Sequence, residues 1–440
     1  MQIGGKQGSR LTGRQFAKMM DVLAETTINM EKGFLMTTLF RIPILLWVDD
    51  VVSFAEGKLD QIEMLNIVDD FAVRHKLEWS TAKCKVMCVG THKNETNEWN
   101  LGTKQIEETK QYRYLGDEVT NNGKNTENIK MRRQKIQATT ATINNIASNE
   151  ILNRVESLVL LELHERITIP SLLNNAESWT LNRSEMEDLE RIEIQALKNL
   201  FRLPLQTPNA AIIFAFGTLY TKQRVDKIQL KYLHKILNRQ QEHWTLKSLK
   251  TLEQLNIGWA KAIKNTLEEY NLPTDFEQIR IIPRPEWERG LTSSIESKNL
   301  ERLIESCHKK EGENRKLKTK TASIVPIITA SNYKRKPQNN ILRTNKQETR
   351  TIVMARYGVL ECGKNYKGTM RETCDVCICI DDENHRINSC TKWKHNNLYE
   401  SAEKVDFNEV YSDELVNIRH VTDKIEKVWN TRTAYGSMHT

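Results

Sequence analysis

The chain has 440 residues, of which 39% are hydrophobic, and a formal net charge of +8 at neutral pH. This length allows two to four domains, and the spread of apolar residues favours folded cores over general disorder. No apolar run reaches the length of a membrane span, and the first residues lack a secretory signal pattern. We therefore expect an intracellular protein in a reducing compartment, without membrane contact.

The positive charge is concentrated in residues 309–350, which carry twelve Lys or Arg residues and three Glu residues. The rest of the chain is close to neutral. A local basic block is typical of proteins that bind a polyanion such as a nucleic acid, although a solvated linker is the alternative for any charge run. Because the range is also weakly patterned, we expect a basic linker or arm.

The first part of the chain, residues 1–125, alternates between helical and extended patterns. Phe16, Met19, Met20 and Leu23 recur at helical spacing on one side of a predicted helix. The spacing of apolar residues further along indicates the following elements: a strand–turn–strand hairpin over 42–54, a helix over 59–71, a strand over 85–90, and a strand with an Asn-Asn-Gly turn over 111–124. These elements predict an α+β fold with a small sheet.

The next part, residues 126–308, is almost entirely helical in pattern. The clearest predicted helices cover residues 129–146, 151–169, 184–201 and 224–237. Asn182 followed by Glu185 indicates a capping box at the start of the third. A cysteine-rich module is expected over 351–395 and a helical tail over 396–440, with one helix from Asp413 to Trp429.

An aspartate pair follows the first apolar run, in the tetrapeptide Trp47-Val48-Asp49-Asp50. Adjacent carboxylates repel each other unless a proton or cation shields them. Mg²⁺ prefers carboxylate oxygens and leaves positions open for phosphates, and two such ions can clamp a phosphoryl displacement. Asp49 and Asp50 are therefore candidate magnesium ligands, and an ordinary turn pair is the alternative.

Four potential zinc ligands lie within a short stretch near the C-terminal end. The pattern comprises three thiols and one imidazole: Cys374, Cys377, His385 and Cys390. Soft ligands in this number and spacing suit a closed tetrahedral Zn²⁺ site, and a chance cluster of thiols is the alternative. Cys362 and Cys379 fall outside this pattern and are interpreted as plain thiols, whereas Cys84 and Cys88 are expected to pack in a core.

Two groups of basic residues are candidates for contact with a nucleic-acid backbone. The first lies at the start of a predicted helix, and the second lies in the basic block: Lys130, Arg132, Arg133 and Lys135, and Lys334, Arg335 and Lys336. Phosphate contacts of this kind bind with strong salt dependence and little sequence preference. A solvated helix face is the alternative for the first group.

The aromatic-x-Asp-Asp hairpin resembles the catalytic hairpin of reverse transcriptases. Upstream, GGKQGSRLTGRQFAKMMDVL resembles the Gln-Gly segment of that family and its helix. Downstream, STAKCKVMCVG resembles the lysine-containing strand, and YRYLGDEVTNNGK resembles the primer-grip turn. A looser likeness continues through AESWTLNRSEMEDLERIEIQALKNLFRLP, and the cysteine module resembles the one that follows the thumb. Four motifs in the family's order indicate the C-terminal part of a non-long-terminal-repeat retrotransposon reverse transcriptase.

This resemblance implies a partial polymerase palm, then a helical thumb and connector, then a zinc knuckle. It implies an RNA template, a DNA primer and Mg²⁺, in the nucleus or the cytoplasm. The implied roles are catalysis for Asp49, Asp50 and Lys83, contact with nucleotide or template for Gln7, Gly8 and Trp47, and primer grip for Tyr114, Leu115 and Gly116.

The sequence departs from the family in three respects. Trp47 replaces the usual Tyr or Phe, and Val48 replaces the usual Ala. The family's third aspartate lies on a strand before the Gln-Gly segment, whereas this sequence starts only a few residues before Gln7. We therefore expect that a fingers and palm segment is missing and that this chain alone does not extend a primer. A non-catalytic nucleic-acid-binding protein built from thumb, basic arm and zinc knuckle is the alternative function, and a degenerate copy is a third.

Overall fold

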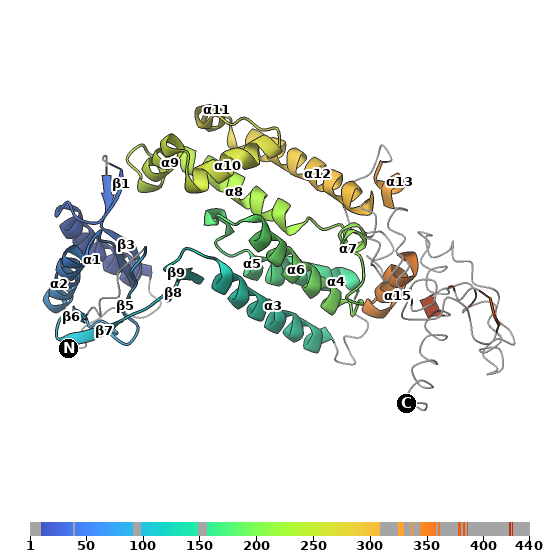
Figure 1. Ribbon diagram of the computed structural model, residues 1–440, viewed down its shortest axis with the longest axis horizontal. Coiled ribbons are helices and arrows are strands. Elements are labelled where there is room, and N and C mark those ends of the chain that lie inside the picture. Colours follow the sequence, from blue (N-terminus) through green and yellow to red (C-terminus); the bar gives the residue numbers. More distant parts are fainter. Residues whose placement is uncertain are drawn as a thin grey trace. The chain divides into compact units, whose positions relative to one another are not determined.

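The computed structural model describes residues 10–37, 40–90, 98–147, 156–308, 324–329 and 344–357, together with residues 335, 337, 360, 377–379, 382, 385, 422, 423 and 425. The chain divides into two compact units, drawn in Figure 1. The first contains Met1–Asn128 and Arg239–Lys261, and the second contains Ile129–Asn238 and Ala262–Thr440. The protein is α+β, as expected, because the strands gather in the first unit and helices form the second.

The first unit combines two long helices with short strands. Its elements in chain order are α1 Arg10–Ile28, β1 Phe34–Thr37, β2 Phe40–Ile42, β3 Ile44–Trp47, β4 Asp50–Ser53, α2 Lys58–His75, β5 Lys85–Val86, β6 Trp99–Leu101, β7 Lys104–Glu108, β8 Gln111–Tyr114, β9 Asp117–Thr120 and α9 Trp244–Leu255. Antiparallel hairpins pair β1 with β2, β3 with β4, β6 with β7, and β8 with β9. Strand β5 lies parallel to β7.

Apolar side chains from α1, α2 and the strands form one core in the first unit. Met20 and Leu23 of α1 contact this core together with Phe71 of α2 and Trp99 of β6. This confirms the predicted helices and the hairpin around the aspartate pair. Leu59 is 81% exposed and does not belong to the apolar side of α2, and the predicted strand over 85–90 extends only across Lys85–Val86.

The second unit is built from helices in the part of the chain that the structure describes. They are α3 Thr126–Ala147, α4 Ser157–Leu163, a π-helical turn His164–Thr168, α5 Ile169–Leu172, a 3₁₀ turn Ala176–Ser178, α6 Arg183–Leu200, α7 Asn209–Phe216, α8 Thr221–Leu237, α10 Gly258–Glu269, α11 Phe276–Ile281, α12 Arg284–His308, α13 Ile324–Thr329 and α15 Lys346–Arg356. Figure 1 shows α8 and α12 running side by side. The helices predicted over 129–146, 184–201 and 224–237 are confirmed as α3, α6 and α8.

Helix α6 begins at the capping box that the sequence indicates. The Asn182 side chain accepts a hydrogen bond from the Glu185 backbone N–H, and the Glu185 carboxylate accepts one from the Asn182 N–H. Two N–H groups that a helix start leaves without partners are satisfied in this way.

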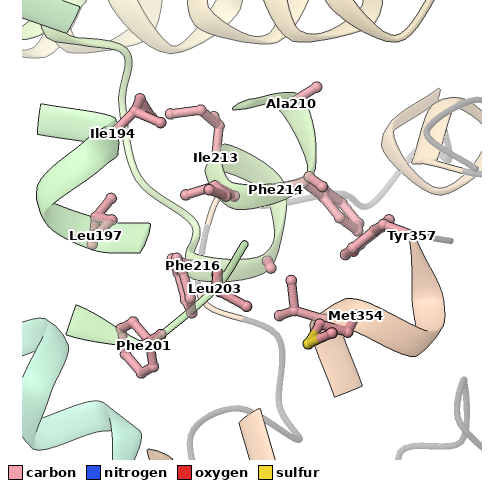
Figure 2. Packing of buried hydrophobic residues seen from close by; sticks show 14 of the residues in the cluster. Ile194, Leu197, Phe201, Leu203, Ala210, Ile213, Phe214, Phe216, Met354 and Tyr357 are labelled. Atoms are coloured by element: carbon pink, nitrogen blue, oxygen red, sulfur yellow. The ribbon is translucent and has the colours of Figure 1, made fainter. Parts of the chain in front are cut away.

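Helix α7 lies at the centre of the largest core. Every residue from Ala210 to Phe216 is buried, so this helix carries no polar face. Figure 2 shows Phe214 of α7 facing Tyr357, which follows α15, and Phe216 lying near Phe201. The last two rings stack with centroids 4.4 Å apart. A helix that is apolar all round requires neighbours on every side.

The expected basic linker over 309–350 contains helix α13 and the start of helix α15. Helix α13 buries Ile324 and Ile328, and α15 buries Val353 and Met354 in the same core as α7. Helix α15 also begins inside the expected linker, at a capping box formed by Asn345. The apolar residues of each segment form one short run, which is too brief to show helical periodicity, and α13 also contains Pro326.

The segment predicted as a helix over 151–169 is described from residue 156 onward. Helix α4 continues through the π-helical turn into α5, which has Pro170 at its start. Because proline lacks an N–H, it cannot donate a helical hydrogen bond. A single π-helical turn before it is a known local adjustment within an α-helix. Of the helix predicted over 413–429, the structure describes only Thr422, Asp423 and Ile425, which are helical. None of the helices among the described residues has both the length and the apolar character needed to cross a membrane.

Candidate functional site

The aspartate pair lies at the tip of the β3–β4 hairpin. Trp47 and Asp50 face each other across the two strands, and Val48 and Asp49 form the two-residue turn. All four side chains are exposed, and Trp47 is 63% exposed. The opposite strand face carries Ile44, which is anchored in the core of the first unit. The core therefore fixes a hairpin whose tip presents two carboxylates and an indole to solvent.

Val48 adopts a left-handed backbone conformation with φ of 58°. This region is costly for a β-branched residue, because the side chain is crowded by the backbone. A two-residue hairpin turn whose first residue has positive φ normally carries glycine there. Strain of this kind persists only where the surrounding structure holds it, and it is often found at functional sites.

Replacing Val48 with glycine is expected to stabilise the first unit by about 1 kcal/mol, because glycine enters positive φ without steric cost. Val48→Ala is the matched control, since alanine keeps a Cβ and is expected to gain much less. Urea denaturation of both variants and the wild type measures the difference. Equal stability of the glycine and alanine variants would show that the turn is not strained.

The β8–β9 hairpin lies close to the aspartate pair. The Tyr112 hydroxyl donates a hydrogen bond to the Lys83 carbonyl oxygen, 3.3 Å away. Burial raises the pKa of Tyr114, and the negative charge of Asp50 raises it further. Burial also raises the pKa of Tyr112, with additional contributions from Cys84 and Asp50. Tyr112 therefore contacts the Lys83 segment, and both tyrosines of β8 lie near enough to Asp50 to be affected by its charge.

Leu115 and Gly116 form the turn between β8 and β9. Their φ values are 46° and 92°, and Tyr114 pairs with Asp117 across the turn. Two successive residues with positive φ define the tight hairpin turn that matches the twist of its strands. The three residues expected to grip a primer therefore occupy the end of this hairpin, near Asp50.

Lys83 does not lie on a strand, although a strand position was implied. It lies in a turn before β5, where its backbone N–H donates to the Ser80 carbonyl oxygen, and its side chain is exposed. Cys84 and Cys88 pack against the core of the first unit, which confirms their expected structural role. Gln7 and Gly8 lie outside the described residues.

The oxygen donors of Asp49 and Asp50 suit a hard cation such as Mg²⁺. Their exposure leaves room for water and phosphate oxygens beside them. Among the described residues, no group of three or more His, Cys, Asp or Glu side chains gathers to hold a metal. The two carboxylates are therefore the right type of ligand for magnesium, but no third carboxylate joins them within that part of the chain.

In the cysteine module, the structure describes Cys377 and His385 but not Cys374 or Cys390. The His385 ring is buried, and its Nε2 has no hydrogen-bond partner in the described part of the protein. The Cys379 sulfur lies 3.1 Å from His385 Nδ1, although the spacing assigned Cys379 no role. A buried imidazole nitrogen with no hydrogen-bond partner in the described ranges fits a metal ligand, since buried polar atoms are usually hydrogen-bonded.

Arg132 was a candidate for contact with nucleic acid, and this prediction is wrong. Its side chain is 1% exposed, and its guanidinium donates to the Leu172 and Asn174 carbonyl oxygens at 2.8 and 2.9 Å. The same group lies 4.4 Å from the centre of the Trp179 ring. Arg132 therefore fastens α3 to the segment between α5 and α6, and a phosphate cannot reach it.

The other basic candidates differ in their surroundings. Lys130 and Lys135 are exposed on α3, and Arg133 forms an ion pair with Asp188 at 3.8 Å. Arg335 donates a hydrogen bond to the Gly217 carbonyl oxygen at 2.7 Å, so it contributes to packing. Lys334 and Lys336 lie outside the described residues.

Comparison with known proteins did not identify a family for this chain. No protein-family model matches the chain. No curated protein matches it either.

Proposed function

We propose that the chain belongs to an RNA-directed DNA polymerase of the non-long-terminal-repeat retrotransposon type. The observation that carries this proposal is the convergence of two hairpins in the first unit. The β3–β4 tip presents Asp49 and Asp50, and the β8–β9 hairpin places Tyr114 within the electrostatic reach of Asp50. The resemblance of both hairpins and of the Lys83 segment to reverse transcriptase motifs supports the same class.

In this proposal each residue group has a separate task. Asp49 and Asp50 would hold Mg²⁺, which when bound supplies charge stabilisation for nucleotidyl transfer, in which a primer hydroxyl bonds to the α-phosphorus of a nucleoside triphosphate and pyrophosphate leaves. Lys83 provides a positive charge beside the triphosphate, and the turn Tyr114-Leu115-Gly116 supports the primer strand. Trp47, exposed next to Asp50, stacks on a base or sugar of the primer end.

The aspartate pair can be tested by its effect on binding an RNA–DNA primer–template duplex. Without a divalent cation, the two carboxylates repel the phosphates, so Asp49→Asn/Asp50→Asn is expected to bind the duplex more tightly than the wild type. Mn²⁺ neutralises the pair, and it is expected to tighten wild-type binding about tenfold, which corresponds to roughly 1.4 kcal/mol. It is expected to leave the variant nearly unchanged. Fluorescence anisotropy at constant ionic strength measures both affinities.

Asp69→Asn/Asp70→Asn is the matched control, because it removes another adjacent aspartate pair from the same unit, on α2. The control is expected to keep the wild-type response to Mn²⁺. An Asp49/Asp50 variant that responds to Mn²⁺ as the wild type does would contradict a metal role. That result would instead favour the non-catalytic nucleic-acid-binding protein, for which the pair is an ordinary turn.

We also propose that the cysteine module binds Zn²⁺ through Cys374, Cys377, His385 and Cys390. The buried Nε2 of His385, which has no hydrogen-bond partner among the described residues, supports this ligand set. Structural zinc sites contribute directly to folding, so loss of the metal is expected to unfold the module.

Purified protein is expected to contain about one equivalent of zinc, the stoichiometry of a closed four-ligand site. Cys377→Ser/His385→Ala is expected to lose it, while Cys362→Ser, outside the ligand pattern, retains it. Atomic absorption measures the zinc. Cys379→Ser tests whether the sulfur beside His385 is a ligand. If this variant loses zinc, Cys379 takes the place of one residue in the proposed ligand set. Zinc-free protein that keeps its fold would contradict the proposal.

A further inference from the structure

The two nitrogens of the His385 ring have different surroundings. Nδ1 lies 3.1 Å from the Cys379 sulfur, within hydrogen-bonding distance. Nε2 is buried and has no hydrogen-bond partner among the residues that the structure describes. The residue as a whole is 7% exposed, so water does not readily reach the ring. One ring nitrogen is therefore held by a neighbouring side chain, whereas the other is buried and has no described partner.

The contact with Cys379 determines what Nε2 can do, because a neutral imidazole carries one proton on its two nitrogens. If Nδ1 accepts a hydrogen bond from Cys379, Nε2 carries the proton and is a buried donor without an acceptor in the described ranges. If Nδ1–H donates to the sulfur, Nε2 presents a lone pair that a metal ion can bind. Buried polar atoms are usually satisfied, so the second tautomer with a bound metal explains both nitrogens.

The main chain of His385 is held by a second contact. Asp382 lies three residues earlier, and its side-chain oxygen accepts a hydrogen bond from the His385 backbone N–H at 2.8 Å. An N-cap residue makes the same contact at the start of a helical turn. Cys379 therefore restricts the rotation of the ring, and Asp382 restricts the backbone that carries it. Together these two contacts fix the direction in which Nε2 points.

The chain turns sharply between Cys377 and Cys379. Ile378 has a φ of 56°, in the left-handed region that is costly for a β-branched residue. Its side chain is 84% exposed, so burial of that side chain does not offset the cost. Strain of this kind persists where neighbouring contacts hold it. Both neighbours fit that requirement, because Cys379 contacts His385 and Cys377 belongs to the proposed ligand set.

We propose that Cys379 and Asp382 are positioning residues of the zinc site. The Cys379 sulfur accepts the Nδ1–H of His385 and leaves Nε2 to bind Zn²⁺, while Asp382 holds the backbone. A histidine that binds a metal almost always donates its other ring N–H to an acceptor, which fixes the tautomer and the orientation of the ring. This inference rests on the zinc site of the proposed function and adds which nitrogen of His385 binds the ion and which residues hold it.

The competing arrangement is a zinc ion bound directly by both the Cys379 sulfur and His385 Nδ1. In a tetrahedral site, bonds of about 2.3 Å to sulfur and about 2.0 Å to nitrogen hold these two atoms about 3.5 Å apart. The observed separation is shorter, at 3.1 Å. Binding through Nδ1 would also leave the proton on Nε2, a buried donor without an acceptor in the described part of the chain. Both observations favour a hydrogen bond between Cys379 and His385.

Titration of the metal-free full chain with Co²⁺ under reducing conditions tests the role of Cys379, because each thiolate bound to cobalt adds charge-transfer absorbance. Cys379→Ala is expected to reach the wild-type absorbance per bound cobalt, since the proposed thiolate ligands are unchanged. In competition with Zn²⁺, it is expected to bind zinc about 10-fold to 100-fold more weakly. Cys379→Ser is expected to recover the wild-type zinc affinity, because its hydroxyl oxygen can accept the Nδ1–H. Cys362→Ala, outside the ligand spacing, is the control and is expected to change neither quantity.

Lower charge-transfer absorbance in Cys379→Ala would make Cys379 a ligand and overturn its positioning role. A zinc affinity of Cys379→Ala equal to that of the wild type would also overturn it, as would a serine variant as weak as the alanine variant. A wild-type chain that binds neither cobalt nor zinc would remove the proposed zinc site itself. Failure of the site and failure of the positioning role are therefore distinguishable.

The same competition tests Asp382. Asp382→Ala removes the acceptor of the His385 backbone N–H and is expected to weaken zinc binding about tenfold, the lower end of the range for residues that hold a metal ligand. Asp382→Asn keeps a side-chain oxygen and is expected to recover the wild-type affinity, since Asn and Asp cap a helical turn about equally well. Far-UV circular dichroism establishes that each zinc-loaded variant remains folded. Unchanged affinity in Asp382→Ala, or equal weakening by alanine and asparagine, would overturn the role of this hydrogen bond.

Discussion

Arg132→Met is expected to destabilise the second unit by about 3 to 5 kcal/mol, the range for breaking a buried charged network. Methionine keeps much of the apolar stem but loses the donors to the Leu172 and Asn174 carbonyl oxygens and the stack on Trp179. The buried hydrogen bond to the Leu172 carbonyl oxygen then loses its charged donor, which adds to the loss. Urea denaturation followed by far-UV circular dichroism measures it, because the second unit is helical.

Lys135→Met, on the same helix with an exposed side chain, serves as the control for Arg132. It is expected to change the stability by less than about 0.5 kcal/mol, as surface substitutions usually do. If Arg132→Met retained wild-type stability and lost affinity for nucleic acid, the guanidinium would be a binding group after all.

Glu193→Ala is the second change with a large expected effect, again about 3 to 5 kcal/mol. Glu193 is 1% exposed and pairs with Arg224 at 3.2 Å, and its carboxylate accepts a hydrogen bond from the Thr221 hydroxyl. His164, in the π-helical turn, lies 3.9 Å from the same carboxylate. Alanine removes the central anion of this network and leaves a cavity around it.

The matched control is Glu165→Ala, which removes the other carboxylate that pairs with Arg224. The Glu165 side chain is 44% exposed, so its loss is expected to cost about 1 kcal/mol or less. Comparable losses for Glu165 and Glu193 would show that burial does not determine the strength of this network.

The Glu193 network also gives the sign of a pH dependence. Burial opposes ionisation of Glu193, but Arg224, His164 and Thr221 outweigh it and lower the pKa of the carboxyl. The stabilisation is therefore present above the carboxyl's unfolded pKa and is lost as the pH falls through its folded pKa. Glu193→Gln is expected to reduce the loss of stability as the pH falls. Urea denaturation at several values between pH 6 and pH 3, about the usual carboxyl range, measures this loss.

Local patterns accounted for much of the fold of the first unit and for several long helices. The apolar spacing in α1 and α2 and the Asn182–Glu185 capping box each depend on residues within two or three turns of one helix. Such signals are readable because propensity and burial agree locally. Helix α7 was missed because its continuous apolar run has no periodicity, and α15 because its polar residues conceal a short buried side.

For the candidate sites too, some features were readable from local sequence and others depended on the tertiary structure. The sequence by itself determined that Asp49 and Asp50 follow one apolar strand and precede another. For residues 111–124 it indicated one strand and an Asn-Asn-Gly turn, whereas the structure has two strands, β8 and β9, joined at Leu115 and Gly116. Only the tertiary structure decided that Asp50 and Tyr114 lie in one region, since their separation along the chain contains no information about distance. It also decided that Arg132 is buried and that the Cys379 sulfur lies beside the His385 ring. A basic side chain looks the same in sequence whether it faces solvent or a buried carbonyl, because its environment is supplied by residues far away in the chain.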